Sequence, residues 1–180
     1  MNKAIFLDRD GVINENTDYL HKKEDLIFIS NSLEALKKIN KSKYKVIIIT
    51  NQSGIARGYF TLEQFHDFNK HFMSELNKEN IKIDGEYFCP HHPDFDMDCS
   101  CRKPKPGMLL KAKKEFNIDL KNSWMIGDDL CDILAGKNAG CKTILVETGH
   151  AGKKDRGYKV SPDFKEKDLY NAVELILKGD

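Results

Sequence analysis

Short hydrophobic runs rich in β-branched residues alternate along the chain with longer segments of helical periodicity. The runs are apolar at nearly every position, which is typical of parallel strands covered on both faces. Between them, apolar residues recur at spacings of three and four, as on the buried side of an amphipathic helix. The pattern predicts strands at Lys3–Leu7, Lys45–Thr50, Glu86–Cys89, Trp124–Gly127 and Thr143–Val146.

The predicted helices lie between these strands and after the last one. A first helix follows two candidate capping serines, Ser30 and Ser32. A second begins with a capping box, because Thr61 is followed by Gln64 three residues later. Regular alternation of strands and helices predicts a doubly wound, Rossmann-like α/β domain over residues 1–180, with no insertion long enough for a separate cap domain. Three more helices are predicted over Met108–Phe116, Asp132–Ala139 and Asp168–Leu177.

Composition and charge restrict the partners. At 180 residues, the chain is long enough to bury most of the surface of one domain. Its 29 basic and 28 acidic residues nearly balance, whereas nucleic-acid-binding proteins carry a marked basic excess. The longest aliphatic run, Val46–Ile49, is far shorter than the roughly 20 residues of a spanning helix, and Asp8 interrupts the N-terminus before a signal-peptide core could form. We therefore expect a cytoplasmic monomer that binds neither nucleic acid nor membrane.

Polar motifs follow the predicted strands where these end, which is where ligands bind in parallel α/β sheets. Asp8 and Asp10 follow the first strand, and two carboxylates at this spacing suit a nucleophile and an acid/base on either side of one phosphorus atom. Thr50 ends the second strand, Lys103 precedes a helix, and Asp128 follows the fourth strand. Each motif alone fits an ordinary polar turn or solvated stretch. Together they predict a phosphate site with a magnesium ion, because Mg²⁺ prefers carboxylates, water and phosphate oxygens.

These four motifs, in this chain order, resemble those of the haloacid dehalogenase-type phosphatases. The resemblance implies that Asp8 attacks phosphorus to form an aspartyl phosphate, while Asp10 protonates the leaving oxygen and later activates water. It implies that Thr50 and nearby amides hold the phosphoryl group and that Lys103 stabilises its charge. Mg²⁺ would be bound by the carboxylates of Asp8 and Asp128 and by the backbone carbonyl of Asp10.

A cysteine-rich loop is predicted over residues 89–105. Three of the five cysteines, Cys89, Cys99 and Cys101, lie close together in a segment that also contains His91 and an adjacent histidine. Three cysteines and one histidine fit a closed tetrahedral zinc site, which would be structural because no coordination position is left open. The residues alone leave the choice of histidine open, and free cysteines in a loop are the alternative.

A zinc loop directly before Arg-Lys-Pro resembles two groups within the superfamily, the D-glycero-D-manno-heptose 1,7-bisphosphate 7-phosphatases and the histidinol-phosphatases. The segments 51–58, 89–93 and 103–108 resemble the heptose enzymes, and this resemblance favours His91 as the zinc ligand. One departure is Asp129, where the heptose enzymes commonly carry a basic residue. The resemblance further implies substrate contacts from Asn16, Thr17, Asp18, Tyr19, Thr50, Asn51, Gln52, Ser53, Arg102 and Lys103.

We therefore expect removal of the C7 phosphate from a heptose bisphosphate, on the route to nucleotide-activated heptose and lipopolysaccharide. Histidinol-phosphatase is the alternative enzyme. A zinc-stabilised binding module that has lost activity is a third reading, but it predicts damage to one of the four motif residues, and all are intact. No pattern assigns a function to the isolated histidine His150.

Overall fold

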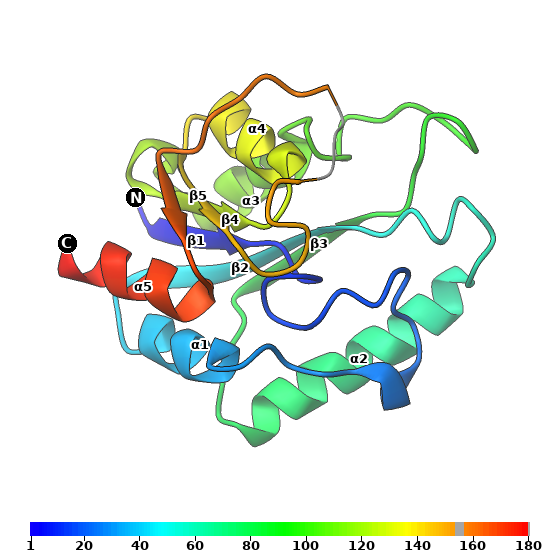
Figure 1. The fold of residues 1–180 in the computed structure, drawn as a ribbon, viewed down its shortest axis with the longest axis horizontal. Helices are drawn as coiled ribbons and strands as arrows, with labels where there is room; N and C mark the ends of the chain where they lie inside the picture. Colours follow the sequence, from blue (N-terminus) through cyan, green and yellow to red (C-terminus); the bar gives the residue numbers. More distant parts are fainter. Residues whose placement is uncertain (154–156, 180) are drawn as a thin grey trace.

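The computed structural model describes residues 1–153 and 157–179 and forms a six-stranded, wholly parallel sheet. The strand order β3-β2-β1-β4-β5-β6 is that of a doubly wound Rossmann-like sheet, which confirms the predicted fold class (Figure 1). All five predicted strands are present to within one residue at each end. The strands are β1 (Lys3–Leu7), β2 (Tyr44–Asn51), β3 (Gly85–Cys89), β4 (Trp124–Gly127), β5 (Lys142–Val146) and β6 (Phe164–Glu166).

Helices cover both faces of the sheet (Figure 1). Helices α1, α2 and α5 pack against one face, and α3 and α4 against the other. In β1, Ile5 and Leu7 join the first hydrophobic cluster, whereas Ala4 and Phe6 join the second. Because both faces are covered, the strand is apolar at successive positions. The helices are α1 (Ser32–Asn40), α2 (Leu62–Lys78), α3 (Gly107–Phe116), α4 (Leu130–Ala139) and α5 (Leu169–Lys178), with short 3₁₀ helices at Lys23–Asp25 and Leu120–Asn122.

The helix starts test the predicted caps. The capping box of α2 is confirmed, because Thr61 and Gln64 exchange side-chain-to-backbone hydrogen bonds. The predicted serine caps of α1 are wrong: Asn31 precedes the helix in a left-handed conformation, and Ser32 is its buried first residue. Helix α4 begins two residues earlier than predicted, because Asp129 caps it.

Strand β6 was not predicted. Its sequence, Phe164-Lys165-Glu166, has no apolar run because it lies at the sheet edge and pairs only with β5. No cap domain is inserted among the described residues, as expected. The predicted single domain over 1–180 includes residues 154–156 and 180, which lie outside the described residues.

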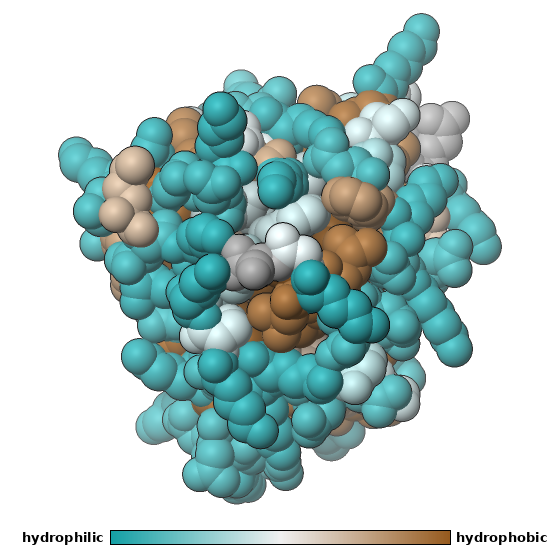
Figure 2. Space-filling view, turned by 90° about the vertical axis from the view of Figure 1, so that its left-hand side faces the viewer, coloured by the Kyte–Doolittle hydropathy of each residue, from teal (hydrophilic) through white to brown (hydrophobic). Residues whose placement is uncertain are grey.

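The two ends of the sheet differ. The N-terminus and the end of α5 lie at the amino ends of the strands, on the left of Figure 1. Figure 2 shows that this face is mostly hydrophilic around a small apolar patch. In the described part of the chain, no helix has the length and apolar character needed to cross a bilayer. The polar motifs lie at the opposite end of the sheet, at the carboxyl ends of the strands. Strands β1 and β2 pair in register from Lys3 opposite Tyr44 to Leu7 opposite Ile48, so their carboxyl ends lie side by side.

Candidate active site

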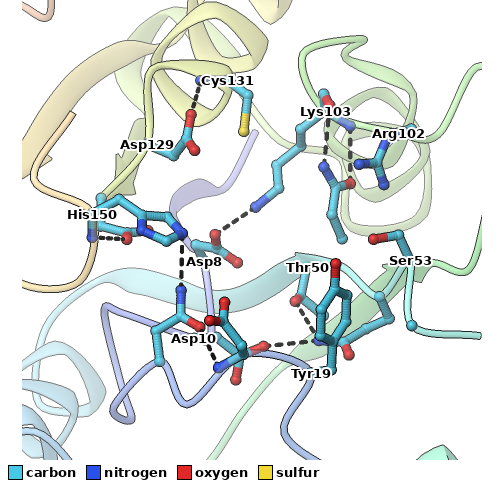
Figure 3. A pocket seen from close by; sticks show the side chains of 16 residues that line it. Asp8, Asp10, Tyr19, Thr50, Ser53, Arg102, Lys103, Asp129, Cys131 and His150 are labelled. Carbon is cyan, nitrogen blue, oxygen red and sulfur yellow. Dashed lines mark hydrogen bonds and ion pairs between the residues drawn. The ribbon is translucent and has the colours of Figure 1, made fainter. Parts of the chain in front are cut away.

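A polar pocket opens at the carboxyl ends of the strands (Figure 3). All five predicted catalytic and magnesium-binding residues line it. Among the predicted substrate contacts, Thr17 alone does not. The pocket is lined by Asp8, Asp10, Asn16, Asp18, Tyr19, Thr50, Asn51, Gln52, Ser53, Gly54, Arg102, Lys103, Asp128, Asp129, Cys131 and His150.

Lys103 lies at the centre of the buried part of this pocket. Its ammonium nitrogen is 2.9 Å from a carboxylate oxygen of Asp8 and 2.7 Å from one of Asp132, and it donates to the carbonyl oxygen of Ile49 at 3.0 Å. Burial favours the neutral amine, but the two carboxylates outweigh burial and hold the pKa of Lys103 well above its usual value. The lysine therefore carries a fixed positive charge beside Asp8.

Three carboxylates crowd around this single cation. Oxygens of Asp8, Asp128 and Asp132 lie within 4.8 Å of one another. Burial raises the pKa of Asp8 to about 7, with a further increase from Asp132 and an opposing effect of Lys103. Burial and the two neighbouring carboxylates raise the pKa of Asp128 to about 8. Repulsion of this kind is relieved when a cation binds between the carboxylates.

Two glycines leave room around Asp128. A Cβ atom at Gly11 or Gly149 would lie 2.5 Å or 2.2 Å from the Asp128 carboxylate oxygen, and both residues have positive φ. The backbone N–H of His150 donates to the same oxygen at 2.6 Å. The carboxylate is therefore held in a tight backbone cradle, and the buried oxygen donors fit a small divalent cation such as Mg²⁺.

Asp10 is fixed by neighbouring side chains. Arg9 Nε and Nη2 donate to its two carboxylate oxygens at 3.1 and 3.0 Å. Asn14 and Gln52 each donate a further bond of 2.9 Å. Burial raises the pKa of Asp10, but these donors outweigh burial and hold the pKa below its usual value. Gln52 also donates to Thr50 Oγ1 at 2.9 Å, so it connects the two motifs.

Asn51 has a role that its motif did not indicate. Its amide nitrogen donates to the backbone carbonyl of Lys103, and its amide oxygen accepts from the backbone N–H of Lys103, both at 3.1 Å. The predicted substrate contact therefore lines the pocket with its side-chain polar groups already occupied. Asn51 fixes the loop that carries Lys103.

The mouth of the pocket is formed by exposed loops. Asp18 and Tyr19 have positive φ values of 46° and 60°, which residues other than glycine rarely adopt. The Tyr19 ring lies edge-on to that of Tyr59, with centroids 4.6 Å apart. These rings are 39% and 56% exposed, so the mouth is far more accessible than the buried lysine. Arg102 lies above Tyr19 in Figure 3 and donates to the carbonyl oxygen of His91 at 3.0 Å.

The predicted zinc ligands are partly brought together. The Sγ atoms of Cys89, Cys99 and Cys101 lie 3.0–3.4 Å apart. His91 is not part of this cluster; its Nδ1 lies 2.7 Å from a carboxylate oxygen of Asp96. Zinc-binding histidines commonly donate their second ring nitrogen to a carboxylate in this way. The adjacent His92 instead has Arg57 Nη2 2.9 Å from its Nε2.

Four pocket residues were not assigned a role by the sequence: Gly54, Asp129, Cys131 and His150. His150 Nε2 lies 3.2 Å from the side-chain nitrogen of Asn16. This contact forms because the chain folds back over β4, so no local sequence pattern indicates it. Asp129 is buried at the start of α4 and accepts from the backbone N–H of Cys131 at 2.9 Å. Capping explains an acidic residue at this position. The capping-box pattern of Asp129 and Asp132 was present in the sequence and could have revealed it.

Comparison with known proteins gives concordant results. The family model described as HAD-hydrolase-like matches residues 100–172. The D-glycero-beta-D-manno-heptose-1,7-bisphosphate 7-phosphatase of Pasteurella multocida is 47% identical over 167 residues, which cover 88% of this chain and 91% of that protein. The chain belongs to this 7-phosphatase family. The resemblance seen in the motifs is thereby confirmed, and the chain is a phosphatase of the HAD-like hydrolases.

Other members of the heptose bisphosphatase family extend this result. The alpha-named enzyme of Photorhabdus laumondii is 46% identical, covering 82% of this chain and 84% of that protein. A crystal structure of the D,D-heptose 1,7-bisphosphate phosphatase from B. bronchiseptica, complexed with magnesium and phosphate, superposes with a TM-score of 0.88. It is 33% identical and covers 99% of both chains. Relatives named for the alpha and beta anomers thus match almost equally well.

Proposed function

We propose that this phosphatase removes the C7 phosphate of D-glycero-D-manno-heptose 1,7-bisphosphate through an aspartyl phosphate on Asp8. The observation that carries the mechanism is the buried Lys103 ammonium, 2.9 Å from Asp8 at the carboxyl ends of the strands. It lowers the repulsion between a carboxylate nucleophile and an anionic ester. The names of the relatives support the sugar substrate and disfavour histidinol phosphate.

The first half-reaction transfers the phosphoryl group to the enzyme. An Asp8 oxygen forms a bond to phosphorus while the bond from phosphorus to the C7 oxygen breaks. The departing alkoxide takes a proton from Asp10. The negative charge of the bound ester raises the pKa of a neighbouring carboxyl group and so favours the protonated form that this step requires. Thr50 and adjacent amides hold the phosphoryl oxygens.

The second half-reaction regenerates the enzyme. Asp10 is now a carboxylate and takes a proton from water, whose oxygen bonds to phosphorus as the Asp8–phosphorus bond breaks. Inorganic phosphate leaves and Asp8 is restored. Lys103 stays charged throughout because Asp132 remains paired with it at 2.7 Å.

We assign the magnesium site to the Asp8 and Asp128 carboxylates and the Asp10 backbone carbonyl. Bound there, Mg²⁺ would supply positive charge that shields the nucleophile from the ester and stabilises the transferring group. Asp132 acts through Lys103 instead of binding the metal. The crowded carboxylates and the glycine cradle support this assignment.

Zinc is proposed to bind Cys89, His91, Cys99 and Cys101 through three sulfurs and the His91 Nε2. The site would hold the loop from which Arg102 and Lys103 extend, with no role in bond making. The grouping of the three sulfurs supports this proposal, since a shared metal requires its ligand atoms in one place.

The mouth favours a primary phosphate on an extended carbon chain. Such a group would reach Asp8 while the sugar ring stays among the exposed loops, where the Arg102 guanidinium would grip the C1 phosphate by two bonds. Heptose 1-phosphate would leave with the phosphate needed for later nucleotidyl transfer in lipopolysaccharide precursor synthesis. We place this activity in the cytoplasm and expect a monomer.

A substrate panel tests the proposal. Phosphate release would be measured with the alpha and beta anomers of the heptose bisphosphate and with histidinol phosphate, with Mg²⁺ and with EDTA. We expect one heptose anomer to have the highest kcat/KM, heptose 1-phosphate as product, and loss of turnover in EDTA. A higher kcat/KM for histidinol phosphate, or release of the C1 phosphate first, would overturn the substrate assignment.

A further inference from the structure

Arg9, the residue between the two motif aspartates, is fully buried. Its side chain is the largest of those with almost no exposed surface. Arginine is rarely buried completely unless its charge is paired, because removing a cation from water is costly. The surroundings of Arg9 therefore indicate what its burial achieves.

The guanidinium of Arg9 faces Asp10 with one edge. Nε and Nη2 bond to the two carboxylate oxygens in a forked arrangement, which fixes both the position and the rotation of the carboxylate. The backbone N–H of Arg9 also donates to Asp8 at 2.7 Å. One residue thus holds both aspartates, by its backbone on one side and its side chain on the other.

An aromatic cage of three α2 residues, Phe65, Phe68 and Phe72, encloses the guanidinium. The guanidinium carbon lies 5.8, 5.0 and 5.8 Å from the three ring centroids. Arginine is stabilised by aromatic faces, and rings of this size restrict its movement. The remaining nitrogen, Nη1, has no hydrogen-bond partner among the described residues. Apolar residues would fill such a position at lower cost, so stability alone does not explain the arginine.

We infer that Arg9 is a positioning residue that holds the Asp10 carboxyl at the angle needed to transfer a proton to the leaving oxygen. This inference rests on the proposed acid/base function of Asp10. Lysine cannot replace Arg9 in this role, because a single ammonium group cannot form two parallel hydrogen bonds to a carboxylate. Helix α2, through its aromatic cage, thereby contributes to proton transfer without reaching the pocket.

The test compares two phosphate esters in Arg9→Lys. A primary alkyl phosphate needs a proton on its leaving oxygen, whereas p-nitrophenyl phosphate releases a stable anion without one. The ratio kcat/KM reports the steps up to formation of the aspartyl phosphate, so it is not affected by the later hydrolysis. Because misplacing a reacting group by about 1 Å costs on the order of 100-fold, we expect kcat/KM to fall about 100-fold for the alkyl ester. For the aryl ester we expect a loss of under about threefold.

Controls separate positioning from damage to the fold. Leu76→Ala removes a buried α2 side chain outside the aromatic cage and should change both esters by the same factor. Phe68→Leu weakens the cage at its closest ring and should give a smaller, alkyl-selective loss even if Arg9→Lys does not fold. Equal losses for the two esters in Arg9→Lys, or an unchanged ratio in Phe68→Leu, would refute the inference. Failure of the parent enzyme on the heptose substrate would refute only the proposed substrate, since both test esters are independent of the sugar.

Discussion

The inner end of the pocket and its mouth are built in opposite ways. At the inner end, buried charged side chains are each held by several bonds: Lys103 by Asp8, Asp132 and a carbonyl, and Asp10 by three side chains. At the mouth, Tyr19 and Tyr59 are exposed on loops, and their rings lie edge-on to each other. Preorganised charge suits the chemical step, and accessible loops suit recognition of a variable sugar. Substitutions at the two ends should therefore affect different kinetic constants.

The largest expected effect is that of Asp8→Asn. An amide is a poor nucleophile, so turnover should fall on the order of 10⁴-fold or more, as in other enzymes that lose a covalent residue. Circular dichroism should show an unchanged fold, because Asn retains the shape of the side chain. Trapping with beryllium fluoride should place the phosphoryl mimic on Asp8 in the parent enzyme only. Activity within tenfold of the parent would contradict the assignment of the nucleophile.

Lys103→Met should have the second-largest effect. It removes the lysine that pairs with Asp8 and Asp132 while keeping a long apolar stem. We expect kcat to fall on the order of 10²–10³-fold, the range seen when one preorganised charge-stabilising group is lost. Magnesium titration should show tighter binding of Mg²⁺ relative to the parent, since the carboxylates lose their competing cation. Lys105→Met is the control, because Lys105 pairs with Asp98 at an exposed site.

Removal of the proposed zinc ion should act on the mouth. Stripping the metal, or replacing Cys99 by Ser, should loosen the loop that carries Arg102 and raise KM about tenfold. The sheet should persist in circular dichroism, because the sulfurs lie outside the main strands except for Cys89 at the end of β3. Metal analysis should find about one zinc per chain in the parent, as for one four-ligand site. An unchanged KM in zinc-free protein would argue against this role of the loop.

The smallest effect is expected for Arg102→Ala. A grip on the remote phosphate is present in both the ground state and the transition state, so KM should rise more than kcat falls. We expect a rise in KM of at most about tenfold, or about 1.4 kcal/mol, which is close to the lower end of the range for charge-assisted hydrogen bonds. A monophosphate that lacks the C1 phosphate provides the matched control, because its KM should not respond. A selective loss of kcat would contradict this role and would instead assign Arg102 to the chemical step at the inner end of the pocket.

The inner end of the pocket and the rest of the site also differ in how far the sequence could predict them. The strands and most inner residues were predictable because Asp8, Thr50 and Asp128 lie at the ends of nearly continuous apolar runs, and parallel strands bring such ends together. Asn51 was predicted as a substrate contact, but its amide bonds to the backbone of Lys103, a partner 52 residues away that no local pattern indicates. His150 depends on a similar long-range return of the chain to Asn16. The phenylalanines of the aromatic cage recur at helical spacing, and such periodicity marks a buried face without saying what it covers.

Cys101, Arg102 and Lys103 are consecutive in the chain. This has a consequence for how the enzyme would select among bisphosphates of different length. If Arg102 binds the remote phosphate while Lys103 meets the reacting one, the two binding groups belong to adjacent residues of the chain. The two groups are also tied down, by the carbonyl oxygen of His91 and by Asn51. Their separation is then a nearly constant dimension of the enzyme. A shorter or longer bisphosphate could satisfy one group only, so selection among bisphosphates would depend on the span between their two phosphorus atoms as well as on sugar stereochemistry.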